Sequence, residues 1–196
     1  MPAYRRKVLL PLASILFIAG CGSSRQRLES IQQLEKLHIE VHGLQILVSA
    51  GVTKQEYSQR FEDSLLKVGD LGQSEALTLP KFPQKEQPTV KAIYEHLSQS
   101  MAAYKAARDY FGEKFDNHFC EEGCSFFPED EYEQVKQEFP SLARLDFGPE
   151  NTWYRDGSGN VVNHSYRRSD MLHALWSMAA AEDNRAGQLT AQLTQE

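Results

Sequence analysis

The feature that most restricts how this chain can fold is a run of apolar residues spaced three and four apart between Arg25 and Ala50. Steps of three and four place side chains on one face of an α-helix. Gly51 follows the run and is expected to end the helix. A helix with one apolar face must bury it against partners, which favours a helical bundle. The predicted inward residues are Leu28, Ile31, Leu34, Leu37, Val41, Leu44 and Val48.

Two more helices are predicted before Phe115. One should follow Thr53, because Thr53 and Glu56 have the spacing of a capping box, in which hydroxyl and carboxylate each accept a backbone hydrogen bond. So short a link from the first helix favours an antiparallel pair. Another is expected from Thr89, a good N-cap after Pro88. The inward residues are predicted to be Tyr57, Phe61, Leu65 and Val68, then Val90, Ile93, Leu97, Met101, Tyr104 and Phe111.

The segment between these helices, from Gly69 to Pro88, is rich in glycine and proline. Such residues interrupt helices and central strands. We therefore expect no regular element here beyond a short strand around Ala76 to Leu79, or a packed surface excursion.

The C-terminal part of the chain is predicted to hold two helices and a β-hairpin. The first helix runs from Pro128 through Phe139, because proline suits a first turn, and Pro140 ends it. In the hairpin, Trp153-Tyr154 and Val161-Val162 flank a turn at residues 156–160. Ser169 should cap the last helix, with Met171, Leu172, Leu175, Trp176 and Ala179 along it and a frayed or bent end near Gly187. The predicted fold class is mainly α: an antiparallel helical bundle over residues 28–196, with a small β-hairpin before the C-terminal helix.

The N-terminus has the layout of a secretory signal. Three cations, Arg5, Arg6 and Lys7, precede eleven mostly apolar residues and then small ones, the arrangement of an exported protein's leader. The apolar part is too short to span a bilayer, which needs roughly 20 such residues.

The end of this segment, Ile18-Ala19-Gly20-Cys21, resembles the lipobox of bacterial lipoproteins. The resemblance implies that residues 1–20 are a signal peptide that is removed. It also implies that Cys21 receives fatty acyl chains such as palmitate, and that residues 21–27 form a lipidated tether. Gly22 stands where those lipoproteins carry Asp when they stay at the inner membrane, so the resemblance implies the outer membrane, facing the periplasm.

The charge balance argues against a nucleic-acid partner. The whole chain has a formal net charge of −6, and loss of the three cations of the signal segment makes it −9. A body this acidic has no general attraction for phosphate backbones or anionic lipid surfaces. The expected partners are the membrane, through the lipid anchor, and an envelope protein.

The two remaining cysteines, Cys120 and Cys124, form an even pair. Disulfides persist in an oxidising compartment, and a helical spacing of four brings the Cα atoms within bridging range. We expect a structural disulfide. A redox couple is disfavoured because intervening glutamates raise thiol pKa values. A metal site that also uses His118 is a further alternative.

Two other patterns resemble metal sites. His38 and His42 lie one helical turn apart, a spacing that can chelate zinc or copper. Both fall at the border of the predicted apolar stripe, so a solvated or half-buried pair is the preferred interpretation. Residues Asp156, Ser158 and Asn160 imitate the start of an EF-hand loop, but Val161 and Arg167 occupy its glycine and glutamate positions. A simple turn is preferred there.

No nucleophile elbow, P-loop or dinucleotide fingerprint occurs in the sequence. We therefore name no catalytic residue and expect no cofactor. The leading hypothesis is a lipid-anchored helical protein of the cell envelope with a binding or structural role rather than an enzymatic one. The alternatives are a metal-handling or redox lipoprotein that uses Cys120 and Cys124 with nearby histidines, and an enzyme with an unrecognised active site.

Overall fold

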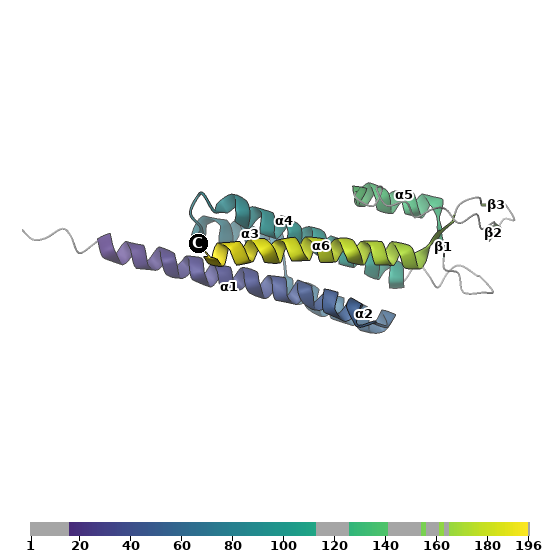
Figure 1. Ribbon diagram of the computed structural model, residues 1–196, viewed down its shortest axis with the longest axis horizontal. Helices are drawn as coiled ribbons and strands as arrows, with labels where there is room; N and C mark the ends of the chain where they lie inside the picture. The colour runs from purple at the N-terminus through teal and green to yellow at the C-terminus, as the bar shows by residue number, and fades with distance from the viewer. Residues whose placement is uncertain (1–15, 113–125, 141–153, 156–160, 163–164, 196) are drawn as a thin grey trace, which may run out of the picture.

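The computed structural model describes the backbone of residues 16–112, 126–140, 154–155, 161–162 and 165–195, and the side chains of 24–110, 133–140 and 170–195. Within these ranges the protein is mainly helical, and its long helices lie side by side in an elongated bundle (Figure 1). The helices are α1 (Leu16–Ser49), α2 (Lys54–Val68), α3 (Leu71–Thr78), the short 3-10 helix η2 (Leu79–Lys81), α4 (Gln87–Gly112), α5 (Glu129–Glu138) and α6 (Arg168–Gln195).

Helix α6 runs antiparallel to α1. Near the start of α1, Arg27 donates a hydrogen bond to the carbonyl of Leu193. Further along α1, His42 contacts Asp183. Because the position on α6 decreases as that on α1 increases, the two helices point in opposite directions.

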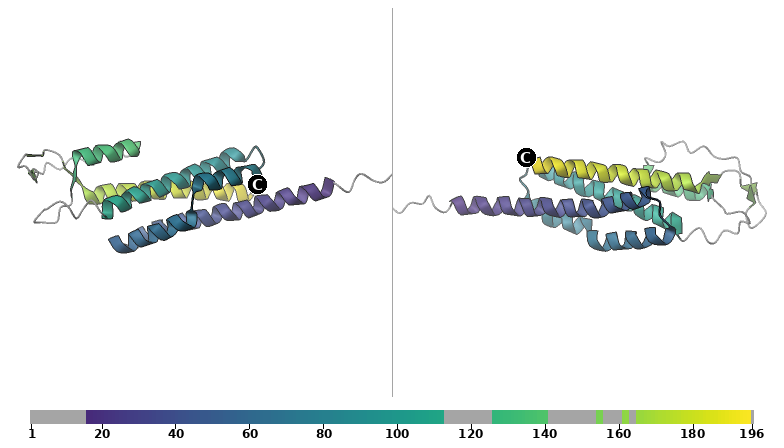
Figure 2. Two further views of the ribbon diagram at one scale, coloured as in Figure 1. Left: turned by 180° about the vertical axis from the view of Figure 1, so that it is seen from behind. Right: turned by 60° about the horizontal axis from the view of Figure 1, so that its bottom comes forward.

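Helices α4 and α2 complete the bundle. Ser100 of α4 donates to the carbonyl of Ala179 on α6. Helix α2 folds back along α1, where Arg60 and Lys67 both reach the carboxylate of Glu40. Figure 2 shows the same arrangement from behind and from below.

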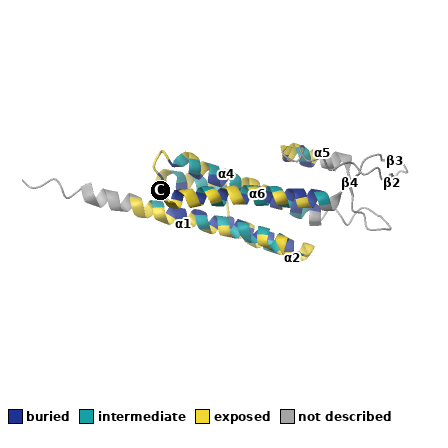
Figure 3. Ribbon diagram, in the orientation of Figure 1, coloured by how far each residue is buried: buried dark blue, intermediate teal, exposed yellow. Residues whose placement is uncertain are grey.

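The core lies along the facing sides of α1, α2, α4 and α6 (Figure 3). Most of the predicted apolar stripe of α1 is buried, as expected. Leu28 is an exception: it is 55% exposed, and from residue 24, where the description of side chains begins, Ser30 is the first buried residue of α1. Leu65 was also predicted wrongly and is 45% exposed, since Ser64 takes the inward position. The correctly predicted core residues are Ile31, Leu34, Leu37, Val41, Leu44, Tyr57, Phe61, Val68, Val90, Ile93, Leu97, Met101, Tyr104, Met171, Leu172, Leu175 and Ala179.

The segment that follows α2 is helical, which corrects the prediction of an irregular stretch or a strand over residues 76–79. Asp70 caps α3 by accepting a hydrogen bond from the backbone of Gln73. This cap offsets the weak helix preference of Gly72, which lies in the first turn. Both prolines of the segment, Pro80 and Pro83, come after α3 has ended.

Several helix ends differ from the predictions. Helix α4 begins at Gln87 rather than at Thr89, since Pro88 is tolerated within a first turn. Helix α6 begins at Arg168 and continues unbroken through Gly187, so the prediction that the helix frays near Gly187 is wrong. Helix α1 runs without interruption through residues 21–27, the predicted tether. Gly51, with φ of +82°, follows the end of α1 as expected.

Within the described ranges, four short strands lie between α4 and α6 along the chain. Strand β1 (Phe126–Pro128) pairs antiparallel with β4 (Ser165–Arg167), and α5 starts one residue later than predicted, after Pro128. Strand β2 (Tyr154–Arg155) pairs antiparallel with β3 (Val161–Val162), with Tyr154 opposite Val162. The turn of the predicted hairpin lies outside the described residues, so the complete hairpin stays a prediction.

Among the helices of the described ranges, none is both long enough and apolar enough to cross a membrane.

Candidate functional site

A group of three ionisable side chains in the described part of the bundle joins α1 to α6. Asp183 of α6 is completely buried, and it faces His38 and His42 on successive turns of α1. Nδ1 of His42 lies 2.8 Å from Oδ2 of Asp183, a hydrogen bond. Nε2 of His38 lies 3.4 Å from the other oxygen, Oδ1. The two imidazole rings are 5.6 Å apart between centroids.

Burial makes the charge on Asp183 costly. Removal from water raises the pKa of this carboxyl above its usual range, and the hydrogen bond from His42 together with the charges of His38 and His42 opposes that rise. A buried carboxylate is tolerated only with partners that compensate for lost hydration. The two histidines are therefore the groups on which this aspartate depends.

The cluster is incompletely satisfied. Nε2 of His38 and Oδ1 of Asp183 are buried, and neither has a hydrogen-bond partner among the described residues. They face each other, yet their geometry does not meet the requirements of a hydrogen bond. Buried polar atoms without partners are uncommon in folded proteins, because each costs roughly 1 to 3 kcal/mol.

Gly187, one turn after Asp183 on α6, makes room for His38. A Cβ atom at this position would lie 2.6 Å from Nε2 of His38 and 2.7 Å from Cε1. The absence of a side chain thus lets the edge of the ring that carries Nε2 approach α6 and lie near Asp183.

Tyr104 of α4 is fully buried. Burial raises the pKa of its phenol, and the negative charge of Asp183 raises it further. Tyr104 also lines a cleft of about 310 Å³ between α1 and α6, together with Gln45, Trp176 and Ala180. Because Ala180 lies one turn before Asp183, this cleft opens next to the cluster.

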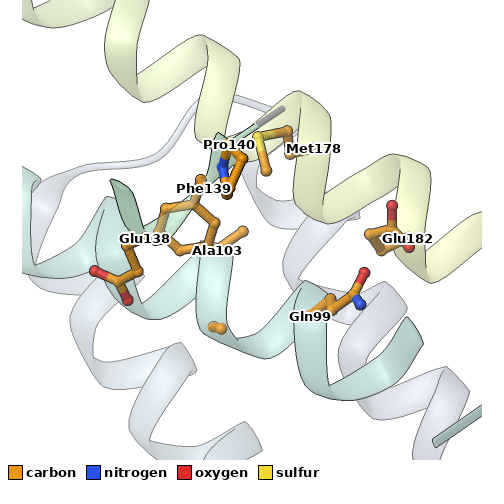
Figure 4. Close-up of a pocket in the computed structure, with 8 residues that line it drawn as sticks. Gln99, Ala103, Glu138, Phe139, Pro140, Met178 and Glu182 are labelled. Carbon is orange, nitrogen blue, oxygen red and sulfur yellow. The ribbon is translucent and has the colours of Figure 1, made fainter. Parts of the chain in front are cut away.

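A second hollow, of about 330 Å³, lies where the end of α5 approaches α4 and α6 (Figure 4). Phe139, Pro140 and Met178 lie near Ala103 on one side, with Glu138 next to Phe139, and Gln99 and Glu182 lie on the other side. The Glu182 carboxylate is already held by other side chains. It contacts Nδ1 of His96 at 2.6 Å and Nη1 of Arg185 at 2.6 Å.

The structure brings together only part of what the sequence suggested. His38 and His42 are neighbours, as their spacing predicted, but their third partner, Asp183, was missed. A signal for it existed: Asp183 occupies an inward position of α6, in step with Leu175, Ala179 and Ala186. A charged residue in such a register is a marker of a buried polar site.

The other sequence candidates cannot be placed. Cys120 and Cys124, His118, and the EF-hand-like Asp156, Ser158 and Asn160 lie outside the described residues. Cys21 lies on the backbone of α1, in a part of the helix whose side chains are not described. The predicted disulfide and the lipidation stay predictions.

Comparison with known proteins adds no assignment: no protein-family model, curated protein or solved structure matches this chain.

Proposed function

We propose that this chain is a lipid-anchored protein of the bacterial cell envelope whose helical domain acts by binding a protein partner rather than by catalysis. In this proposal residues 1–20 are removed, Cys21 carries the lipid, and the domain faces the periplasm from the outer membrane. The domain itself is proposed to be an antiparallel helical bundle with a small β-hairpin before α6.

The observation that carries the proposal is the position of the lipobox cysteine on α1. Cys21 lies on the same uninterrupted helix as Ser30, the first buried residue among the described side chains. Ser30 comes nine positions after Cys21, which corresponds to about 14 Å at 1.5 Å per residue. Figure 1 shows this end of α1 extending beyond the C-terminal end of α6. A lipid on Cys21 would therefore hold the bundle close to the membrane surface, on a helical rather than a flexible connection.

A line of exposed apolar side chains on α1 supports a protein partner. Leu28, Ile39 and Ile46 are 55%, 64% and 59% exposed. Their separations of eleven and seven residues place them along one side of the helix. Single exposed apolar residues are ordinary, but an aligned set is typical of a surface that contacts another protein.

The anchor is tested by exchanging residues 1–21 for a signal peptide that is cleaved without lipidation. We expect the exchanged protein in the soluble periplasmic fraction, and the original protein, with the mass of three acyl chains on Cys21, in the membrane fraction. Replacement of Cys120 by alanine is the matched control and should leave the protein in the membrane. An exchanged protein that stays with the membrane contradicts the anchor.

The partner is tested separately, by photo-crosslinking in intact cells. A photoreactive residue at Ile39 or Ile46 should give one defined adduct that mass spectrometry identifies. The same residue at Gln188 or Gln192, exposed positions of α6, is the control. Equal adducts from both helices, or none from α1, would contradict partner binding by this surface.

The alternative of a metal-handling or redox lipoprotein built on Cys120 and Cys124 stays a prediction. The intact mass of protein made in the periplasm decides between its forms. A stable mass that is two protons light, with no bound metal, indicates a structural disulfide.

A further inference from the structure

The geometry points to a binding site for a divalent transition-metal ion between α1 and α6, with His38, His42 and Asp183 as its ligands. Each residue offers one ligand atom, and these atoms lie within 4.8 Å of one another. Two imidazoles and one carboxylate form a ligand set that proteins use for zinc and for other first-row transition metals. This proposal uses neither Cys120 nor Cys124 as a ligand and does not depend on the lipid anchor.

The separation of the two unsatisfied atoms supports the assignment. Nε2 of His38 and Oδ1 of Asp183 are 3.4 Å apart without a hydrogen bond. Ligands that lie about 2.0 to 2.1 Å from a tetrahedral zinc ion are about 3.3 Å from each other. The two atoms therefore stand at the distance that a shared ion requires.

The contact between His42 and Asp183 fits the same site. Nδ1 of His42 and Oδ2 of Asp183 are joined by a hydrogen bond of 2.8 Å. Nδ1 of His42 can bind a metal once that bond breaks, because metals bind deprotonated imidazole, and Oδ1 is then the ligand atom of Asp183. An ion would thus replace a single hydrogen bond, and it would also satisfy the two atoms that lack a partner.

The surroundings provide support and access. Gly187 leaves the space in which the His38 ring lies, and Tyr104 is buried close enough to feel the charge of Asp183. The side chain of His42 is 40% exposed and that of His38 is 23% exposed, so the cluster lies close to the surface, although Nε2 of His38 and Oδ1 of Asp183 are themselves buried. With three protein ligands, a fourth position would remain for water or a further ligand, as in other three-ligand zinc sites.

Imidazole ligands select the class of ion. Magnesium and calcium prefer oxygen ligands, whereas zinc, copper and nickel bind imidazole well. Zinc is the natural probe because it undergoes no redox change. Bound zinc would connect α1 to α6, since His42 and Asp183 lie 141 residues apart in the sequence. It would therefore stabilise the folded state relative to the unfolded state.

The test is urea unfolding of the full chain, without a histidine tag, in EDTA and in excess zinc. At a zinc concentration one hundred times the dissociation constant, the folding equilibrium constant should rise about 100-fold. Asp183→Asn and His42→Gln should each abolish this gain. His96→Gln is the matched control, because His96 also pairs with a carboxylate of α6 but has no second histidine. The double replacement of Cys120 and Cys124 by serine should keep the gain.

A second measurement covers the case in which a variant folds poorly. Equilibrium dialysis of the metal-free original protein should find one tightly held zinc ion per chain, and His42→Gln should lose it while retaining its helical circular dichroism. The site would be overturned by the absence of a zinc-dependent gain in the original protein, or by an equal gain in the original protein and in Asp183→Asn. Loss of the gain only when the cysteines are replaced would place the metal elsewhere and would also overturn it.

Discussion

A Cβ atom on Gly187 would lie 2.6 Å from Nε2 of His38, well inside the distance at which non-bonded atoms meet. Gly43 has a contact of the same length, 2.6 Å, but to Nη2 of Arg60. Both glycines lie inside long helices, where alanine is preferred by roughly 0.8 to 1.0 kcal/mol. The two positions differ in the freedom of the neighbour. Arg60 is a long, partly exposed side chain, whereas the His38 ring is held against Asp183.

Gly43→Ala should therefore raise the free energy of unfolding by up to about 1 kcal/mol, because the end of Arg60 can move aside. Gly187→Ala should raise the free energy of unfolding by less, or should lower it, because the His38 ring must move away from Asp183. Urea denaturation of both variants in EDTA measures the difference. An equal gain in both would show that nothing holds the ring in place.

Two buried serines allow a matched test of unsatisfied hydroxyl groups. Ser64 and Ser100 are both completely buried in helices. Oγ of Ser100 donates to the carbonyl of Ala179 at 2.8 Å, whereas Oγ of Ser64 has no hydrogen-bond partner among the described residues. Replacement by alanine adds the same helix preference at both positions, so that contribution cancels in the comparison.

We expect Ser64→Ala to be the more stable of the two variants by about 1 to 2 kcal/mol, because only Ser100→Ala loses a hydrogen bond. Thermal and urea unfolding of the two variants and the original protein check this. Similar losses in both variants would mean that the Ser64 hydroxyl is hydrogen-bonded in solution.

The ion pair between Arg27 and Glu86 closes one end of the bundle. Nε of Arg27 lies 2.7 Å from Oε2 of Glu86, whose side chain is almost completely buried. The same guanidinium donates to the carbonyl of Leu193. Replacement of Arg27 by methionine should lower the free energy of unfolding by about 2 to 3 kcal/mol, because it leaves a buried carboxylate without its main partner.

The double variant Arg27→Met with Glu86→Gln should recover part of this loss, since the buried charge is then gone as well. A double-mutant cycle in urea gives the coupling between the two residues. Simple additivity of the two single changes would mean that the ion pair contributes nothing to stability.

The parts of the fold that the sequence predicted are those fixed by local pattern. The apolar period placed Ile31 to Leu44 inward correctly because helix geometry alone decides which residues share a face. The pattern could not show that the helix surface around Leu28 has no packing partner among the described residues, so the prediction for Leu28 is wrong. The sequence does not predict helix α3, because its N-cap, Asp70, lies in a segment rich in glycine and proline, residues that usually interrupt helices.

The sequence predicts only the part of the candidate site that lies on α1. His38 and His42 are one turn apart on a single helix, so their proximity follows from the sequence. Asp183 lies on α6, 141 residues after His42 in the sequence, and only tertiary packing brings Asp183 to the two histidines. Its inward register on α6 marked a buried charge, but the pattern did not identify its partner.

The capping box at the start of α2 gives a prediction about pH. The Glu56 carboxylate accepts hydrogen bonds from the backbone N–H of Thr53 at 3.0 Å and from its hydroxyl at 2.7 Å. Both hydrogen bonds hold the pKa of Glu56 below its usual value of 4.5, and the bond from the Thr53 hydroxyl has the larger effect. The folded state thus favours the ionised form. The resulting stability is present above pH 4.5 and is lost as the pH falls through the lowered value.

Glu56→Gln should accordingly be less stable than the original protein at neutral pH, and the difference should shrink below pH 4.5, the ordinary pKa. Urea unfolding of both proteins between pH 3 and pH 7 measures it. Thr53→Ala is the control: it should cost about 1 kcal/mol through loss of the cap, and in that background Glu56→Gln should have a smaller effect. A difference between Glu56→Gln and the original protein that is constant with pH would mean that the carboxylate is not held by Thr53 in solution.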